Sequence, residues 1–491
     1  MFRYRNLVCN LIPILIAITL LPSPLASAQA QAAPEPDVQA VDAYLQALIR
    51  ANRIAGLAVA IVQGDQIVFS RGYGEAGPGR PMTPQTQLYI GSVTKSFTAL
   101  AVMQLVEQGK LELDAPVQRY LPWFQVADAA ASTQITVRHL LNHTSGLSEL
   151  GDPNASTYAP TLTDEARTLR HVRLTAPVGT KFQYYNKNYR VLGLLIEQAS
   201  GQAYSDYMRA HVFTPLGMAH TVANPADAPD LAQSYSQAFG FPMPYPLTFH
   251  PSAVPSGYII SSAEDMARYL IAQINDGRIR DRALVQPTTL AQMRTPPPGI
   301  GSRYGMGWMV FEDGNTLFHG GDLEGFHALV GVGLKEKIGF VILCNQNSLA
   351  QMLTIYDALP GDLSSLLMGK THPKPSSFAW VGLVLAILAA ADLLNHLRLF
   401  WQLPAWVIKT AQQSRVVQWL KILPGLIVAL ALLLWLPSLL SAALGSSGNW
   451  VDMFGLLPDV TAWLFIGLTL VLIRGVAKII LLARQSVISL S

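Results

Sequence analysis

Three long apolar stretches near the C-terminus constrain the fold of this chain more than any other feature. They lie near residues 378–394, 422–444 and 460–483. Each is long enough, or nearly so, to cross a bilayer as a helix, because a span needs about 20 apolar residues. Buried helices of a soluble domain are the alternative, but three such runs in succession favour the membrane. We therefore expect a C-terminal helical membrane domain with three transmembrane helices over 378–484.

The charges between these stretches predict their orientation. The connection 395–421 carries four basic residues and no acidic one, whereas 445–459 carries two acidic residues and no basic one. Basic connections stay on the cytoplasmic side of a membrane, so the chain before residue 378 should lie outside. Arg474 and Lys478 fall in the inner part of the third stretch, where long basic side chains can reach the interface.

The N-terminus has the pattern of a secretory signal, which requires the same orientation. Residues 1–28 combine a basic start, a short apolar core and small residues ending at Ala28. Residues 29–36 have the composition of a flexible linker. We expect a folded extracytoplasmic domain at 37–369, joined through a polar linker at 370–377 to a multi-pass domain in the cell membrane.

Composition excludes some classes of function. Hydrophobic residues make up 51% of the 491 residues and charged residues 13%, an apolar balance typical of a chain with membrane segments. The net charge of +3 is small and spread out, so nothing points to a nucleic-acid partner. Cys9 lies in the predicted leader, which leaves Cys344 alone in the mature chain, so no internal disulfide is expected.

Residues 37–369 alternate between strand and helix patterns. Two apolar runs around Gln63-Gly64-Asp65 predict a first β-hairpin, and the stretch at about 115–290 is mainly helical or loop-like. Five prolines predict an irregular loop at 241–257. Later strands are expected at 307–312, 316–319, 327–334 and 338–344, followed by a helix at 349–368. This order predicts an α/β fold, an antiparallel β-sheet flanked by helices with an inserted helical subdomain.

A serine and a lysine stand three positions apart at the start of a helical pattern. Ser92 and Lys95 precede an apolar-periodic run, and positions i and i+3 share a helix face, so the amine can reach the hydroxyl. A serine becomes a nucleophile when a base takes its proton, and burial can lower the lysine pKa enough for that role. Free N–H groups at the helix start can stabilise an oxyanion. Alone, the pair is equally typical of a capping serine beside a solvated lysine.

Two later patterns offer further polar groups. Tyr184 and Asn186 lie two apart, so both side chains point to one side of an extended chain. A phenol beside a lysine can shuttle a proton, and an amide can bind a substrate carbonyl. His319-Gly320-Gly321 is expected to end a strand, where glycines let a substrate approach the strand edge. Taken singly, these patterns are equally typical of an aromatic core edge and a plain hairpin end.

One histidine pair has a spacing that can bind a metal ion. His139 and His143 lie one helical turn apart. No third ligand follows at a recognisable offset, and paired histidines on a short helix are usually structural. We therefore expect no metal and no other cofactor.

In this order, the Ser92/Lys95 pair, Tyr184-Tyr185-Asn186 and His319-Gly320-Gly321 resemble the motifs of the penicillin-recognising serine hydrolases. The similar branch holds class C β-lactamases, D-alanyl carboxypeptidases and esterases. The resemblance covers residues from about 40 to about 350 and includes the stretches 140–147, 177–179 and 304–308.

The resemblance implies a mechanism with named roles. Ser92 would be the acylated nucleophile. Lys95 and Tyr184 would act together as general base and then as general acid for the leaving group. Asn186 would orient the substrate and Lys95.

The third motif implies where the substrate binds, and it is also where this chain departs from the pattern. His319, Gly320 and Gly321 would contact the substrate, and the backbone N–H groups of Ser92 and Asp322 would form the oxyanion hole. A lysine in the place of His319 is a fixed cation suited to a substrate carboxylate, whereas histidine is mostly neutral at pH 7. The departure weakens the expectation of penicillins or D-Ala-D-Ala termini and leaves room for esters or other amides.

The expected function is a membrane-tethered serine hydrolase that cleaves a β-lactam, D-amino-acid peptide or ester through a Ser92 acyl-enzyme. An acylated sensor is the second hypothesis, in which the acyl group stays and the membrane helices pass a signal. The intact Tyr184 favours turnover. An inert binding scaffold is the third, and the complete set of Ser92, Lys95 and Tyr184 argues against it. Expected partners are a small-molecule or peptide substrate and the membrane.

Overall fold

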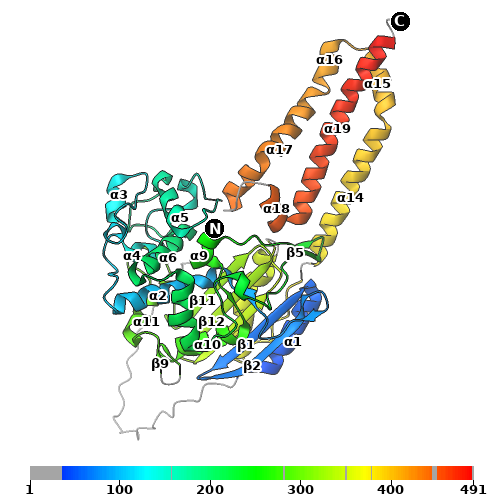
Figure 1. Cartoon of the computed structure of the whole chain (residues 1–491). Helices are drawn as coiled ribbons and strands as arrows, with labels where there is room; N and C mark the ends of the chain where they lie inside the picture. The colour runs from blue at the N-terminus through cyan, green and yellow to red at the C-terminus, as the bar shows by residue number, and fades with distance from the viewer. Residues whose placement is uncertain are drawn as a thin grey trace, which may run out of the picture. The chain divides into compact units, whose positions relative to one another are not determined.

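One antiparallel sheet organises the folded domain (Figure 1). The computed structural model describes residues 36–488, apart from 156, 280–281, 349–350, 378 and 445–449. The predicted signal peptide at 1–28 lies outside the described residues, as does nearly all of the linker that follows it.

The sheet has seven strands in the order β10, β11, β12, β13, β1, β2, β3. Their bounds are β1 (Gly56–Gln63), β2 (Gln66–Gly77), β3 (Arg80–Pro81), β10 (Met309–Val310), β11 (Thr316–Leu323), β12 (Phe326–Gly333) and β13 (Ile338–Cys344). Two-stranded pairs join β4 (Leu88–Tyr89) to β7 (Ile260–Ser261) and β8 (Arg278–Ile279) to β9 (Arg282–Ala283). Because β13 pairs with β1, with Leu57 opposite Cys344, the sheet unites the first and last strands of the domain.

The predicted first hairpin and the four predicted later strands are present, with changes in length. Gly64 takes a positive φ of 62° at the turn from β1 to β2. β2 then continues to Gly77 and pairs with β3. β11 runs to Leu323, so the His319 motif lies inside a strand and does not end it. The chain turns only at Gly325, whose φ of 76° favours glycine.

Side chains of the central strands alternate between two cores, because successive residues of a strand point to opposite faces. In β1, for example, Ala60 faces the larger core and Val59 the smaller one. Helices α1 (Val38–Asn52) and α13 (Asp357–Leu367) cover the smaller core. The sheet is therefore the middle layer of an α/β sandwich, as the sequence predicts.

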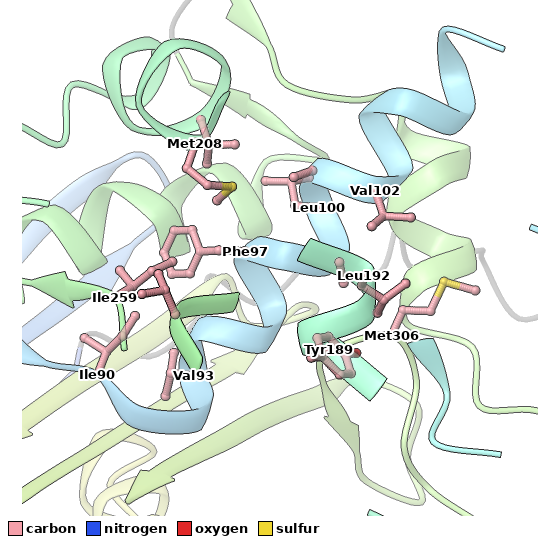
Figure 2. Close-up of a cluster of buried hydrophobic side chains, with 14 of the residues drawn as sticks. Ile90, Val93, Phe97, Leu100, Val102, Tyr189, Leu192, Met208, Ile259 and Met306 are labelled. Atoms are coloured by element: carbon pink, nitrogen blue, oxygen red, sulfur yellow. The ribbon is translucent and has the colours of Figure 1, made fainter. Parts of the chain in front are cut away.

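The helical insert packs against α2 (Thr94–Glu107), a helix that is buried over most of its length. Residues Thr94 to Leu105 of α2 are all buried, the polar side chains among them included. Figure 2 shows Phe97 and Leu100 of α2 packed among side chains of other elements, including Met208. The α-helices between β4 and β10 are α2 (Thr94–Glu107), α3 (Ala129–Gln134), α4 (Val137–Leu141), α5 (Leu162–Thr168), α6 (Asn186–Ser200), α7 (Tyr204–Met208), α8 (Thr214–Leu216), α9 (Val254–Gly257), α10 (Ala263–Ile274) and α11 (Pro287–Met293).

The proline-rich stretch 241–257 is more regular than the sequence predicts. β5 (Tyr235–Ala238) and β6 (Phe241–Pro244) form a hairpin, and Pro251 begins a helical turn that leads into α9. Proline is tolerated in edge strands and in the first turn of a helix, where its missing N–H is not needed. The prolines here shape short elements, so the prediction of an irregular loop is wrong.

The C-terminal part is helical throughout its described length. Its long helices are α14 (Ala379–Trp401), α17 (Leu423–Leu444) and α19 (Pro458–Ile488), and α14 and α17 both contact α19. The segments Trp380–Trp401, Arg415–Leu439 and Pro458–Arg484 have mean hydropathies of 1.7, 2.3 and 2.2, and each is long and apolar enough to cross a membrane. Shorter helices stand between them: α15 (Leu403–Ala411), α16 (Arg415–Leu420) and α18 (Trp450–Leu456).

Candidate active site

The predicted nucleophile and its lysine meet at the start of α2. Ser92 lies in a single 3-10 turn, Gly91–Val93, that leads directly into the helix. Lys95 follows in the first helical turn, and its side chain is buried. The distance between Lys95 Nζ and Ser92 Oγ is 2.9 Å. The helix-start position and the i, i+3 contact both agree with the sequence analysis.

Lys95 Nζ has two further partners, and both are hydrogen-bond acceptors. The side-chain Oδ1 of Asn186 lies 2.8 Å away. The backbone carbonyl oxygen of Ser256, in α9, lies 2.6 Å away. The predicted contact between Asn186 and the lysine is therefore present, whereas no sequence pattern indicates Ser256 as a partner.

The surroundings of Lys95 favour its neutral form. Burial lowers the pKa of Lys95 well below its usual value, and the positive charge of Arg190 lowers it further, against an opposing effect of Glu149. A neutral amine has two N–H groups, which suffice for the two acceptors, and one lone pair. That lone pair can take the hydroxyl proton of Ser92.

Tyr184 borders the same amine at the mouth of the site. The distance from Lys95 Nζ to the centre of the Tyr184 ring is 4.8 Å. The ring opens to solvent, with 37% of the residue exposed, whereas its hydroxyl end is enclosed and hydrogen-bonds Ser92. Burial raises the pKa of the Tyr184 phenol and the bond to Ser92 lowers it in part, so the phenol is protonated at neutral pH. This geometry suits Tyr184 as a proton donor and Lys95 as the base.

Tyr185 confirms the alternation of side chains along this segment. Its hydroxyl donates to Asp152 Oδ2 at 2.7 Å in the protein interior, away from Lys95. Asn186 is the first residue of α6, so the helix holds its amide at a fixed place beside the lysine. Tyr184 and Asn186 therefore share one side of the chain, as their spacing predicts.

His319 is buried and held by two neutral partners. Its Nδ1 donates to the carbonyl oxygen of Gly320 at 2.6 Å, and its Nε2 lies 3.1 Å from the hydroxyl of Tyr304. Burial lowers the pKa of His319 to about 4, and the nearby Lys95 contributes to the shift. The imidazole is therefore neutral at physiological pH. Its Nε2 accepts a hydrogen bond from the Tyr304 hydroxyl, because Nδ1 carries the ring proton.

Two glycines let the β11 backbone touch the turn that carries Ser92. A Cβ on Gly321 would lie 2.9 Å from the Ser92 nitrogen, and one on Gly91 would lie 2.6 Å from the Asp322 nitrogen. Both approaches are too close for a side chain, and Gly91 also has a positive φ of 50°. The predicted oxyanion donors, the N–H groups of Ser92 and Asp322, therefore lie at the place where the Gly91 turn touches the backbone of β11.

Asp322 and Gly320, the two other predicted substrate-binding residues of this segment, have surroundings that differ from those of His319. The Asp322 carboxylate lies 2.8 Å from His327 Nδ1 and accepts a hydrogen bond from Asn347 Nδ2 at 3.1 Å. A Cβ on Gly320 would meet no atom within 4 Å. Packing therefore does not require glycine at position 320.

His139 and His143 take part in local structure. His139 Nδ1 accepts from the Thr136 N–H in a helix cap, and His143 Nδ1 accepts from the Tyr185 N–H. Among the residues that the structure describes, no group of three side chains could hold a metal ion. The His143 ring packs 4.5 Å from that of Tyr184, so it forms part of the wall of the site.

Sequence reasoning did not predict the contacts of four groups in or near the site. Ser256 contributes only a backbone carbonyl, which leaves no signal in residue type. Arg190 follows Asn186 by one helical turn, a spacing that could have revealed it. Glu149 and Tyr304 come from distant segments, and only the fold brings them here.

Comparison with known sequences agrees with this geometry. A sequence profile of the beta-lactamase family matches residues 41–359. Protein flp of Staphylococcus aureus (strain MW2) is 29% identical over 320 residues, which are 63% of this chain and 63% of that protein. The match therefore spans less than two thirds of that relative. Penicillin-binding protein 4 of Amycolatopsis lactamdurans is 29% identical over 354 residues, 67% of this chain and 91% of that protein.

Solved structures share the fold. The octameric penicillin-binding protein homologue from Pyrococcus abyssi has a TM-score of 0.60 and 28% identity over 71% of this chain and 81% of that one. EstCE1, a hydrolase with promiscuous acyltransferase activity, has a TM-score of 0.57 and 26% identity over 68% of this chain and 98% of that one. The profile match extends over most of the chain, from α1 to α13, and encloses the Ser92 and Lys95 contact: this chain belongs to the beta-lactamase family.

Proposed function

We propose that this chain is a membrane-tethered serine hydrolase that cleaves an ester or amide bond through an acyl-enzyme on Ser92. One observation carries the proposal, the 2.9 Å contact between Lys95 Nζ and Ser92 Oγ. It pairs a hydroxyl with an amine whose pKa is lowered by burial. Relatives named as a hydrolase and as penicillin-binding proteins support the same class of reaction.

The arrangement supplies a group for each step. The neutral Lys95 amine takes the Ser92 proton as Oγ attacks the substrate carbonyl carbon, and the N–H groups of Ser92 and Asp322 stabilise the oxyanion. When the bond to the leaving group breaks, that group takes a proton from Tyr184, which regains one from the Lys95 ammonium. Water then attacks the acyl-enzyme and gives a proton to Lys95. That proton returns to Oγ as the acid leaves.

The third motif supports substrates that need no carboxylate clamp. His319 has a pKa of about 4 and two neutral partners, so it offers no positive charge near pH 7. A carboxylate bound there would lack a charge-assisted hydrogen bond, the stronger kind. We therefore favour neutral esters or amides over penicillins and peptides that end in a carboxylate.

The first experiment labels the nucleophile in the full-length protein in detergent. A fluorophosphonate probe should label wild type and not Ser92→Ala, and equal labelling of both would overturn the assignment of Ser92. Short-chain nitrophenyl esters, a chromogenic β-lactam and a D-Ala-D-Ala peptide then report turnover. Continued product release supports the hydrolase, whereas one equivalent of product followed by a stable acyl-enzyme supports the sensor.

The topology needs its own test. The basic connection between the first two long helices supports a cytoplasmic position for it, and so an extracytoplasmic active site. A reporter that works only outside the cytoplasm should be active when fused after residue 370 or 450 and inactive after 410. The reverse pattern would overturn both the signal-peptide and the loop-charge arguments.

A further inference from the structure

Arg190 is a buried cation near the catalytic lysine, and the mechanism above does not use it. It lies on α6 one turn after Asn186, so the two side chains point to the same side of the helix. Only 4% of Arg190 is exposed, and its guanidinium carbon lies 4.6 Å from the centre of the Tyr158 ring. A long cationic side chain is rarely buried so completely without a specific partner.

Its contacts lead directly to Lys95. The guanidinium donates to the Glu165 carboxylate through NH1 and to Ser256 Oγ, 3.4 Å away, through Nε. Ser256 Oγ itself donates to the Ala253 carbonyl at 2.9 Å. The carbonyl of the same Ser256 accepts from Lys95 Nζ at 2.6 Å. A continuous chain of contacts therefore runs from Glu165 through Arg190 and Ser256 to the lysine.

We propose that Arg190 is a positioning residue that holds the Ser256 carbonyl in place and, through it, aims the Lys95 amine at Ser92. The inference rests on the proposed function, because it gives Arg190 a part in acyl transfer. The guanidinium also keeps a fixed positive charge near the amine, which opposes protonation of Lys95. Loss of the contact lets the lysine turn away from Ser92, and loss of the charge lets it keep its proton to higher pH.

The charges around Lys95 support the second part of this role. Arg190 lowers the pKa of Lys95 in addition to the larger effect of burial, and Glu149, from the turn at Glu149–Gly151, raises it. Other titratable groups that face this amine are neutral near pH 7, because burial lowers the pKa of the imidazoles and raises that of the phenols: His143, His319, Tyr184 and Tyr189. Arg190 is therefore the charge that favours the free amine.

The same buried network contains a matched control. Lys187 also lies on α6 and is buried, and it pairs with Asp152 at 2.8 Å, with Glu165 3.8 Å away. Its remaining bonds go to the Asn154 carbonyl and the Thr168 hydroxyl. A purely structural role of the network would make Lys187 and Arg190 equivalent in their effect on Ser92.

The experiment measures the rate at which a fluorophosphonate labels Ser92 in the full-length protein, as a function of pH. In wild type the rate should rise with pH as Lys95 loses its proton. In Arg190→Gln the inflection should move up by about one pH unit, the size of the effect of one nearby charge. The plateau should fall on the order of tenfold through misplacement of the amine. Arg190→Lys keeps the positive charge but cannot contact Glu165 and Ser256 at the same time. The plateau of its labelling rate should therefore fall, while the inflection stays at the wild-type pH.

A second variant guards against misfolding. Arg190→Gln leaves the Glu165 carboxylate short of a partner, whereas the double substitution Arg190→Gln/Glu165→Gln removes both charges together. We expect the double variant to fold and to show the same raised inflection. Lys187→Gln should lower the melting temperature and leave the inflection at its wild-type pH.

The possible results separate two kinds of failure. An unchanged plateau and inflection in a folded Arg190→Gln or double variant would overturn this inference and leave the hydrolase proposal standing. An equal shift of the inflection in Lys187→Gln would overturn it as well. Absence of Ser92 labelling in wild type at every pH would overturn the proposed function, and this inference with it.

Discussion

The surroundings of Lys95 and those of Lys187 differ in one respect that decides what each lysine can do. Both side chains are buried, with 0% and 1% of each residue exposed. Lys187 faces two carboxylates, those of Asp152 and Glu165. Lys95 bonds only to neutral groups, on Ser92, Asn186 and Ser256. A buried charge is stable when it is paired, and unpaired it is given up through a shift in pKa. One region is therefore an ion pair, and the other has the neutral surroundings that the proposed base requires.

Burial alone thus does not suit a lysine to act as a base, because the charge of its partners decides whether its ammonium form is stabilised. The two regions are separated by a single step along α6, because Asn186 faces Lys95 and the next residue is Lys187. Successive helix residues point about 100° apart, since 3.6 residues make a turn. One helix can in this way serve a catalytic pocket and a structural ion pair at once.

The largest expected effect is on chemistry at Lys95. Lys95→Met should lower the rate of Ser92 acylation by about 10²–10⁴-fold, the usual contribution of a general base. The melting temperature should stay close to that of wild type, because a neutral amine contributes no ion pair. Probe-labelling kinetics and a thermal melt on the same sample give both values. A large loss of stability with little loss of rate would contradict the comparison.

The opposite pattern is expected for the second lysine. Lys187→Met removes the cation paired with the buried Asp152 carboxylate, while Glu165 keeps Arg190 as its partner. The unpaired buried carboxylate should lower the free energy of unfolding by about 3–5 kcal/mol. The folded fraction should label Ser92 at nearly the wild-type rate. Denaturant titration measures the first quantity and probe kinetics below the transition measure the second. If the folded variant cannot be labelled, Lys187 belongs to the catalytic machinery and the comparison fails.

A smaller effect, on substrate preference, is expected when a third buried lysine is introduced at position 319. His319→Lys places a lysine beside neutral partners, and a bound substrate carboxylate would supply the missing counter-charge. A charge-assisted bond contributes about 1.5–3 kcal/mol, so kcat/KM for carboxylate substrates relative to neutral esters should rise at least about tenfold. Parallel assays with a penicillin and a neutral ester check this ratio. An unchanged ratio would mean that position 319 does not contact the substrate carboxylate.

The smallest effect concerns the pH dependence of substrate choice. Because the pKa of His319 is lowered to about 4, the imidazole is neutral above roughly pH 5 and gains its charge only in more acidic buffer. The ratio of kcat/KM for carboxylate substrates to that for neutral ones should therefore be flat from pH 6 to 8 and rise as the pH approaches 4. A steep change between pH 6 and 7 would mean that His319 titrates normally and is better solvated than the structure indicates.

Most of the site contacts that could be predicted from the sequence follow from the spacing of residues close together in the chain. The i, i+3 relation of Ser92 and Lys95 and the alternation of Tyr184 and Asn186 are properties of helix and extended chain, so residue order suffices to predict them. The alternating strands and long apolar runs predicted the sheet and the C-terminal helices for the same reason. Each of these features depends on neighbours in the chain.

Other features depend on contacts between distant segments, and these were not predictable. Ser256 acts through a main-chain oxygen that every residue possesses. The position of His319 inside β11 follows from pairing with β12, which continues to Leu323 opposite Phe326. The prolines of β6 predict a loop, whereas the structure shows an edge strand paired with β5. The local sequence does not distinguish the two, because proline is tolerated in both.

The pairing of β1 with β13 has a consequence for biosynthesis. A ribosome completes β1 and β2 early, yet the partner of β1 on its other side is among the last parts of the domain to be made. Until residue 344 has been synthesised, the central strand keeps one open edge, which is a site for wrong association. The entropic cost of closing a loop grows only slowly with its length. Synthesis of the intervening chain is therefore the main delay before β13 can pair with β1. Because α14 begins at Ala379, after β13 and α13, the last strand of the sheet is made before the first long apolar helix.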